Sequence, residues 1–241
     1  MKLRVLGCST PYPRPQFPCS GYLVSSTENH ILLDCGSAVF GALLEHIDPS
    51  SLSAVWISHM HPDHCGDLPA LANWALNTAN GPRIPVAGPE TWDARLNAFI
   101  SNDNKADVVA DIFDVQYLQD GGTLSAGEFN LASRLVHHSV ATYGVRVSDG
   151  THTIAYSGDS GPCAALDEVA DNADLFLCEA GSNEPAEYHM TAQQAHELAV
   201  RANTRRLILT HIPADAPVNK PAGQSAPSDI AYPGGEWLTS E

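Results

Sequence analysis

The sequence predicts a single α/β domain, and three observations lead to that class. Short apolar runs with the period of strands alternate with helix-like segments in the first half, and strands predominate in the second half. Side chains of metal-ligand type directly follow several of these runs, as at the edge of a layered α/β sheet. The 241 residues fit one large domain without a linker, so 1–241 is expected to be one unit, with 214–228 an irregular loop.

In the first half, β-branched and aromatic runs predict strands, and longer segments with apolar residues every three or four positions predict helices. A proline-rich loop, 8–20, is long enough to border a site. Asp67 is a candidate cap for the helix that follows it, and 101–111 is expected to be a polar surface crossing. The predicted strands are Lys2–Gly7, Gly21–Ser25, 31–34, 54–57 and 84–87, and the predicted helices are 37–46, 67–77 and 90–100.

In the second half, Asp149-Gly150 between two apolar runs indicates a type I′ hairpin turn. Thr191 and Gln194 form a capping box that predicts a helix to about Ala202. A last hairpin is expected to turn at 233–235. The other predicted elements are a helix at Ala164–Ala170 and strands at 113–118, 122–124, Phe129–Val136, Thr142–Ser148, 151–157, Leu175–Glu179 and Arg206–Thr210.

Acidic residues outnumber basic ones by 28 to 12, so the formal net charge is −16. Such a surface repels phosphate backbones at long range, which disfavours nucleic acid as a partner but not a small phosphate ester. The same charge is also typical of a surface that only aids solubility. No run approaches the ~18 apolar residues of a membrane span, and the first residues resemble a strand rather than a signal peptide. We therefore expect a cytoplasmic protein without a membrane partner, whose six cysteines are reduced thiols.

The densest group of candidate site residues is the stretch from Ser58 to Asp67, which contains three histidines and two aspartates. It follows the apolar run 54–57, so it is expected to be a tight loop after a buried strand. Alternation places His59 and His61 on the same side of an extended segment, where both imidazoles can reach one metal ion. After Pro62, the side chains of Asp63 and His64 can reach a second site. These ligand types favour zinc, manganese or iron over calcium.

The same arrangement, a candidate ligand just after an apolar run, recurs at four other places in the chain. Singly, such residues are most often caps or turns, but their recurrence after five strands indicates one shared site. An aspartate in a glycine turn can supply the anion that bridges two metal ions, and Asp159 is the candidate. The four places are Asp34, the pair His137-His138, Asp159 and His211.

Taken together, these residues resemble the motifs of the metallo-β-lactamase-fold hydrolases, and the likeness covers nearly the whole chain. It implies a four-layer αβ/βα sandwich, in which two mixed β-sheets face each other between helices. It also implies two divalent metal ions, with zinc as the first expectation and manganese as the alternative. Asp34 would be the family's aspartate that hydrogen-bonds beside the ligand loop. One metal ion would be held by His59, His61 and His138, the other by Asp63, His64 and His211, with Asp159 as the bridge.

Within this family, the chain is most similar to the phosphodiesterase branch that includes RNase Z. The segment Glu187-Tyr-His-Met-Thr191 resembles that branch's catalytic histidine element, which implies that His189 acts on phosphate. Glu179 would orient His189. Bacterial forms of RNase Z carry a tRNA-binding arm between the third and fourth motifs, whereas only about twenty residues separate His138 from Asp159 here. The whole chain is most similar to the actinobacterial cyclic-nucleotide phosphodiesterases, with Leu6–Ser9, Ser20–Leu23 and Ala155–Asp159 among the segments that carry the likeness. This resemblance allows a homodimer.

These observations lead to the hypothesis that the protein hydrolyses a small cyclic phosphodiester, 3′,5′-cyclic AMP above all. A hydroxide between the two metal ions would attack, Asp63 would accept or orient its proton, and His189 would donate to the phosphate or the leaving oxygen. The residues that recognise the base are unknown, with Tyr12, Arg14 and Phe17 of the proline-rich loop as a first guess.

Three other functions remain open at this point. They are an RNase Z-like nuclease, a hydrolase of thioesters, lactones or β-lactams, and a non-catalytic member of the fold. Retention of His189 and Glu179 favours phosphate chemistry. The remaining histidines, among them His30, His46, His152 and His196, are expected to face solvent.

Overall fold

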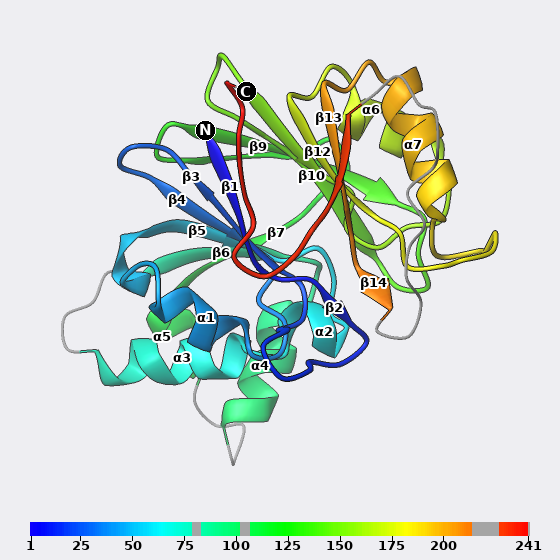
Figure 1. Ribbon diagram of the computed structural model, residues 1–241. Helices are drawn as coiled ribbons and strands as arrows, with labels where there is room; N and C mark the ends of the chain where they lie inside the picture. The colour runs from blue at the N-terminus through cyan, green and yellow to red at the C-terminus, as the bar shows by residue number, and fades with distance from the viewer. Residues whose placement is uncertain (79–82, 102–106, 214–226, 241) are drawn as a thin grey trace.

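Two seven-stranded mixed sheets pack face to face, and helices cover the outer surface of each (Figure 1). This computed structural model describes residues 1–78, 83–101, 107–213 and 227–240. The four layers confirm the expected class, an α/β fold with two mixed sheets flanked by helices. The two halves of the chain build one sheet each, except that the last strand returns to the first sheet.

The first sheet has the order β16-β1-β3-β4-β5-β6-β7. Its first strands pair antiparallel, whereas β4 to β7 are parallel, because helical segments connect them on the outer face. Its strands are β1 (Lys2–Gly7), β3 (Gly21–Ser25), β4 (His30–Leu33), β5 (Leu52–Trp56), β6 (Ile84–Gly88), β7 (Phe113–Tyr117) and β16 (Glu236–Leu238). The helical elements of this half are α1 (Val39–Leu44), η1 (Pro49–Ser51), α2 (Pro62–Cys65), α3 (Leu68–Asn77), α4 (Trp92–Ile100) and α5 (Val108–Ile112).

The second sheet has the order β15-β13-β12-β11-β10-β9-β8. Here β8 to β11 form an antiparallel meander, and β11, β12, β13 and β15 are parallel. Its strands are β8 (Thr123–Ala126), β9 (Phe129–Val136), β10 (Thr142–Ser148), β11 (Thr153–Tyr156), β12 (Leu175–Glu179), β13 (Arg206–Thr210) and β15 (Ser228–Ile230). Helices α6 (Ala164–Ala170) and α7 (Ala192–Arg201) cover it, and a separate two-stranded ribbon joins β2 (Ser9–Thr10) to β14 (Ile212–Pro213).

The central core between the sheets is apolar but contains buried hydrogen bonds that join the two layers. Trp56 and Tyr156 are among its largest buried side chains. The hydroxyls of Tyr22 and Thr210, one from each sheet, lie 2.7 Å apart, and Trp56 Nε1 donates to Ser133 Oγ at 3.1 Å. Because buried polar groups need partners, these bonds fix how one sheet sits on the other. Two further apolar clusters fill the space between a sheet and its helices, one at the first sheet and one at the second.

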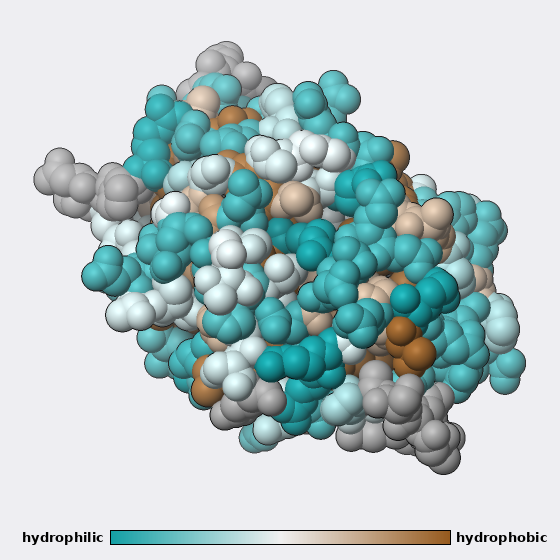
Figure 2. Space-filling view, turned by 90° about the horizontal axis from the view of Figure 1, so that it is seen from above, coloured by the Kyte–Doolittle hydropathy of each residue, from teal (hydrophilic) through white to brown (hydrophobic). Residues whose placement is uncertain are grey.

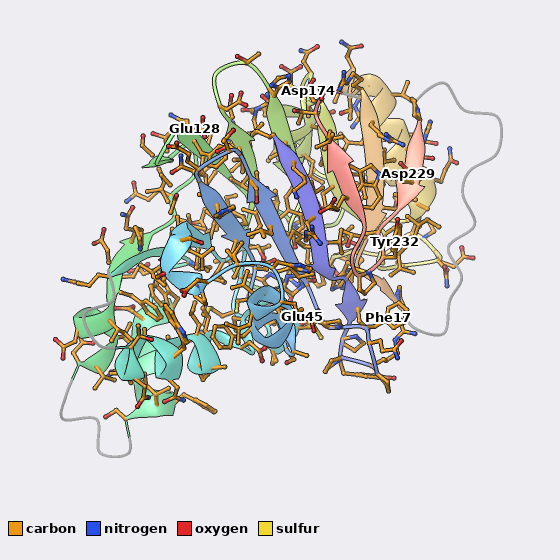
Figure 3. The ribbon with its side chains drawn as sticks, turned by 60° about the vertical axis from the view of Figure 1, so that its left-hand side comes forward. Phe17, Glu45, Glu128, Asp174, Asp229 and Tyr232 are labelled. Carbon is orange, nitrogen blue, oxygen red and sulfur yellow. The ribbon has the colours of Figure 1, made fainter. Side chains whose placement is uncertain are left out.

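Most predicted elements lie where the sequence placed them, but two turns differ. Between β10 and β11 only Gly150 has a positive φ, whereas a type I′ turn needs two such residues. The loop is longer than predicted, and Asp149 Oδ1 accepts hydrogen bonds from the backbone of Thr151 and His152. The last predicted hairpin is also wrong, because β15 pairs with β13 in the second sheet and β16 pairs with β1 in the first. Asp229, labelled in Figure 3, joins them across this edge by accepting from Arg206 Nε and Trp237 Nε1.

Four other local expectations are corrected. Asp67 does not cap α3 with its side chain, because that carboxylate accepts a hydrogen bond from the backbone of Phe40 in α1. The helix predicted at 37–46 is shorter, and part of 101–111 forms α5. His196 lies on the buried side of α7, with 3% of its surface exposed, and does not face solvent. The irregular loop expected at 214–228 lies outside the described residues, apart from its end, where Ser228 begins β15.

Figure 2 shows a face of the molecule that is largely hydrophilic, with small scattered apolar areas. This agrees with a chain in which acidic residues predominate. Among the described residues, no helix is long and apolar enough to cross a bilayer.

The bond between Tyr22 and Thr210 gives a first prediction. Tyr22→Phe should lower the free energy of unfolding by about 1–3 kcal/mol, because the buried Thr210 hydroxyl loses its partner. Chemical denaturation measures this effect. The double variant Tyr22→Phe, Thr210→Val should recover part of the loss, since neither group then lacks a partner. Equal losses in the single and double variants would contradict a role for this bond.

Candidate metal centre

The histidine-rich loop leaves the end of β5 and becomes the short helix α2, which begins at Pro62. Proline suits this first position because it has no amide hydrogen to leave unpaired. The loop backbone is held by its neighbours, since Cys35 N donates to His64 O and Ser20 N donates to Asp63 O. The turn therefore brings the side chains of His59, His61, Asp63 and His64 to the same edge, where strands of the second sheet also end.

The first group of candidate ligands consists of three imidazoles around one carboxylate. His61 Nδ1 lies 3.0 Å from His59 Nε2 and 3.3 Å from His138 Nε2. These separations match the ~3.3 Å edge of a tetrahedron whose metal–nitrogen bonds are about 2.0–2.1 Å. Asp159 Oδ2 lies 3.8 Å from His59 Nε2. The ligand atoms of His59, His61, His138 and Asp159 all lie within 4.8 Å of one another.

The second group is buried beside the first. Asp63, His64 and His211 place their ligand atoms within 4.8 Å of one another. Asp63 Oδ2 lies 3.3 Å from His211 Nε2 and 3.8 Å from His64 Nε2. His211 has φ of 54°, an unusual backbone conformation for a residue with a side chain, and such strain is common at functional sites.

Asp159 faces both groups and provides the test of whether a cation fits. Its Oδ1 lies 3.2 Å from His64 Nε2, and its Oδ2 lies 3.2 Å from His211 Nε2. Both Asp159 Oδ1 and His64 Nε2 are buried, and neither has a hydrogen-bond partner within the part of the chain that the structure describes. A cation between these two atoms would be coordinated by both. The donor set therefore fits divalent metal ions.

The electrostatics favour metal binding at neutral pH. Burial lowers the pKa of His59, His61 and His138, so their nitrogens are free to act as ligands. Although burial acts in the opposite direction, His211 and His64 hold the pKa of Asp159 well below its usual value. Burial alone would lower the pKa of His64, but the carboxylates of Asp159 and Asp34 outweigh it and raise this pKa well above 6.5. A metal ion at His64 Nε2 therefore displaces a proton.

Asp34 supports this centre from the end of β4. Its buried carboxylate accepts hydrogen bonds from Ser58 N at 2.7 Å, Ser58 Oγ at 2.9 Å, and Tyr156 OH at 2.7 Å. It also lies 2.7 Å from His64 Nδ1, which leaves His64 Nε2 to face the ligand group. Similarly, His138 Nδ1 lies 3.1 Å from the carbonyl oxygen of Tyr188, so its Nε2 faces the group. Such outer contacts fix ring orientation and tautomer.

His189 stands beside the ligand groups and is paired with a buried carboxylate. Its Nδ1 lies 2.9 Å from Glu179 Oε1, which also accepts a hydrogen bond from Ser160 N. Gly181 N donates to Glu179 Oε2 at 2.7 Å. A side chain at Gly181 would place its Cβ 2.9 Å from Glu179 Oε2 and 3.0 Å from His189 Nδ1, so glycine is needed here. The hydrogen bond to Glu179 raises the pKa of His189 above 6.5.

A cavity of about 300 Å³ opens onto these side chains. From the proline-rich loop its wall takes Thr10 and Pro11, whereas Tyr12, Arg14 and Phe17, the residues singled out from the sequence, do not line it. The volume is at the low end for ligand sites, about 300–1,000 Å³. The lining residues are Thr10, Pro11, His61, Asp63, His138, Ser139, Asp159, Ala186, Glu187, Tyr188, His189 and His211.

The structure thus brings together eight of the candidate residues, Asp34, His59, His61, Asp63, His64, His138, Asp159 and His211. His137, the other member of the histidine pair, is exposed and belongs to neither ligand group. Sequence reasoning missed three supporting hydroxyls, those of Thr10, Ser58 and Tyr156. Ser58 could have been suspected because it begins the histidine-rich stretch. Tyr156 and Thr10 carried no such signal, because their roles depend on contacts with residues 122 and 53 positions away.

The fold and the site together define a metal-dependent hydrolase. The chain belongs to the metallo-β-lactamase superfamily, since the family model "Beta-lactamase superfamily domain" matches residues 29–212. The expected family is confirmed, and divalent metal ions follow from the family together with the two ligand groups.

Several known proteins resemble this chain over most of its length. An uncharacterized protein of Mycobacterium leprae is 38% identical over 222 residues, 88% of this chain and 78% of the relative. The probable metallo-hydrolase YhfI of Bacillus subtilis is 31% identical over 222 residues, 88% of this chain and 87% of the relative. The crystal structure of YhfI has a TM-score of 0.85 at 28% identity, covering 98% of this chain and 99% of that one.

Two further matches carry more specific names. A ribonuclease Z of Chlamydia trachomatis is 28% identical over 269 residues, 88% of this chain and 87% of the relative. The structure of a diphosphatase from the PhnP family has a TM-score of 0.78 at 19% identity, covering 98% of this chain and 97% of that one. The second likeness shows the fold alone.

The two ligand groups predict about two divalent ions per chain in the purified, metal-loaded protein, measured by elemental analysis. His138→Ala should lower this number, because it removes a ligand from the first group. The neighbouring variant His137→Ala is the matched control and should retain both ions. Equal metal contents in the two variants would contradict the choice of His138.

The pairing of His189 with Glu179 predicts a pH effect. Glu179→Gln removes the charge that raises the pKa of His189, so His189 should lose its proton at lower pH. If protonated His189 is needed for turnover, the alkaline limb of kcat/KM should move to lower pH. A pH–rate profile measures this shift. An unchanged alkaline limb, with retained metal, would argue against this role.

Proposed function

We propose that this protein is a phosphodiesterase that hydrolyses a small phosphodiester, with 3′,5′-cyclic AMP as the favoured substrate. The observation that carries the proposal is the His189–Glu179 pair, which borders the same small cavity as both ligand groups. His189 is not among the proposed ligands of either metal ion and can therefore act as a proton donor beside them. Phosphate transfer gains from such a donor, because charge develops on the phosphate and leaving oxygens.

In this mechanism, His59, His61 and His138 would hold one divalent ion, and Asp63, His64 and His211 the other, with Asp159 shared. When bound, the metal ions would supply Lewis acidity, which makes water more acidic and offsets the charge of the phosphate. Asp63 would orient the attacking water and accept its proton. His189 would donate a hydrogen bond to a phosphate oxygen or a proton to the leaving oxygen, and Glu179 would keep it charged and oriented.

The charge of the cavity supports a diester over more highly charged substrates. Among the described residues, its lining contains three carboxylates, Asp63, Asp159 and Glu187, and no lysine or arginine. The metal ions and His189 would therefore be the cations that meet the phosphate. A diester carries one negative charge, whereas a phosphomonoester carries nearly two at neutral pH. We therefore expect the diester to bind better.

The relatives support phosphate chemistry but leave a second candidate, cleavage of RNA. The chlamydial match is named ribonuclease Z, and its alignment covers 269 positions against the 241 residues of this chain. That relative therefore carries residues that this chain lacks. The short connection between His138 and Asp159, which here is mainly the β10–β11 hairpin, together with the net charge of −16, favours the small diester.

A substrate panel tests the proposal. Cyclic AMP, cyclic GMP, a chromogenic phosphodiester, a chromogenic phosphomonoester, a precursor tRNA and nitrocefin should be compared by kcat/KM. The small diesters should be the best substrates. Turnover of nitrocefin without phosphodiester turnover would overturn the substrate class, and preference for the tRNA would favour the nuclease.

Replacement of His189 tests its assigned role. His189→Ala should lower kcat on the chromogenic diester by about 10²–10⁴-fold, since a positioned general acid contributes that much. Metal content should stay unchanged, as measured by elemental analysis on the same sample. The exposed His46, on the outer face of the first sheet, provides the control variant His46→Ala, which should keep full activity.

A further inference from the structure

We propose that Thr10 is a positioning residue of the metal centre, whose buried hydroxyl holds the carboxylate of Asp63 in place. Thr10 Oγ1 donates a hydrogen bond to Asp63 Oδ2 at 2.9 Å. Both side chains are almost fully buried, with 6% of Thr10 and 7% of Asp63 exposed. The consequence for catalysis rests on the proposed function, whereas the consequence for metal binding does not.

The local fold brings Thr10 and His211 to the same oxygen of Asp63. Thr10 lies on β2, which pairs with β14, and β14 begins directly after His211 (Figure 1). In this ribbon, Pro213 is the partner of Thr10. Asp63 Oδ2 lies 2.9 Å from the Thr10 hydroxyl and 3.3 Å from His211 Nε2. One two-stranded ribbon therefore delivers a hydrogen-bond donor and a candidate metal ligand to one carboxylate oxygen.

A carboxylate in this position needs a fixed partner. The carboxylate of Asp159 repels that of Asp63 and favours its rotation away from the centre, whereas the imidazoles of His211 and His64 attract it. The Thr10 hydroxyl opposes this rotation, because a hydrogen bond to a charged acceptor is among the stronger ones. It also determines which oxygen faces His211, because Thr10 holds Oδ2 on that side. The orientation of Asp63 is thus set before any metal ion binds.

The neighbouring residue, Ser9, separates this role from a general role in holding the loop. Ser9 is 1% exposed, and its hydroxyl donates to Tyr12 O at 3.0 Å and accepts from Arg14 Nε at 3.3 Å. These contacts stabilise the proline-rich loop, on whose outer part Phe17 is seen in Figure 3. Ser9 therefore serves the loop, and Thr10, one residue later, serves the site.

Three variants test the proposal. Thr10→Val removes the hydroxyl and keeps the shape, Thr10→Ser keeps the hydroxyl, and Ser9→Ala loosens only the loop. The protein is loaded with zinc, and the rate of zinc release to a chromogenic chelator is recorded, together with kcat and KM on a chromogenic phosphodiester. Thr10→Val should release one of the two ions roughly 10- to 100-fold faster, because loss of a partner of a metal ligand weakens metal affinity by about that factor.

The proposal also predicts how the effects divide among the variants. In Thr10→Val, kcat should fall while KM changes little, because Asp63 is misplaced but the cavity keeps its shape. Thr10→Ser should restore both zinc retention and kcat, and Ser9→Ala should release zinc like the unaltered protein. Unchanged zinc release and kcat in Thr10→Val would overturn the proposal. Equal effects of Ser9→Ala and Thr10→Val would overturn it too, since loop stability would then explain both.

Two further outcomes are distinguishable. If Thr10→Val does not fold, Thr10→Ala replaces it as the hydroxyl-free variant. If neither folds while Ser9→Ala does, Thr10 serves folding, and the positioning role is refuted. If none of the proteins cleaves a phosphodiester but Thr10→Val still releases zinc faster, the proposed function fails while the role of Thr10 stands.

Discussion

The hydrogen bonds of one buried carboxylate, Asp34, underlie the whole centre. It lies at the end of a strand of the first sheet and binds the loop of Ser58 and His64 as well as Tyr156 of the second sheet. Burying a charge without partners would cost several kcal/mol, so all of these donors must be in place when the protein folds. Asp34 has φ of 59°, a strained conformation that these contacts sustain. The same bonds thus join the sheets and orient a candidate metal ligand.

This arrangement means that neither half of the chain contains a complete site. His59 and His61 come from the first sheet, whereas His138, Asp159 and His211 follow strands of the second. Asp159 lies within 3.8 Å of imidazole nitrogens from both halves. Metal binding and the packing of the two sheets are therefore coupled, because a cation that satisfies these atoms also holds the layers together. The reactive edge is a consequence of the same contacts that build the core.

Much of the fold and the site could be predicted from the sequence, because local patterns determine them. In the long strand Phe129–Val136 the alternating residues Phe129, Leu131 and Ser133 are buried, and a ligand such as His211 directly follows its strand. What failed depended on distant partners. The predicted final hairpin was wrong because residues 228–230 and 236–238 pair with strands of different sheets. The predicted cap of α3 was wrong because the Asp67 carboxylate accepts a hydrogen bond from the backbone of α1 instead. Thr10 and Tyr156 were missed for the same reason, since each acts on a residue far away in the chain.

We expect two divalent ions to share Asp159 between ligand groups from the two sheets. Anomalous diffraction at the zinc edge, from crystals of the zinc-loaded protein, tests it most directly. We expect two peaks about 3.5–4 Å apart, one beside His59, His61 and His138 and the other beside Asp63, His64 and His211. The contact between Asp34 and His64 should remain intact. A single peak, or peaks at other side chains, would contradict the account.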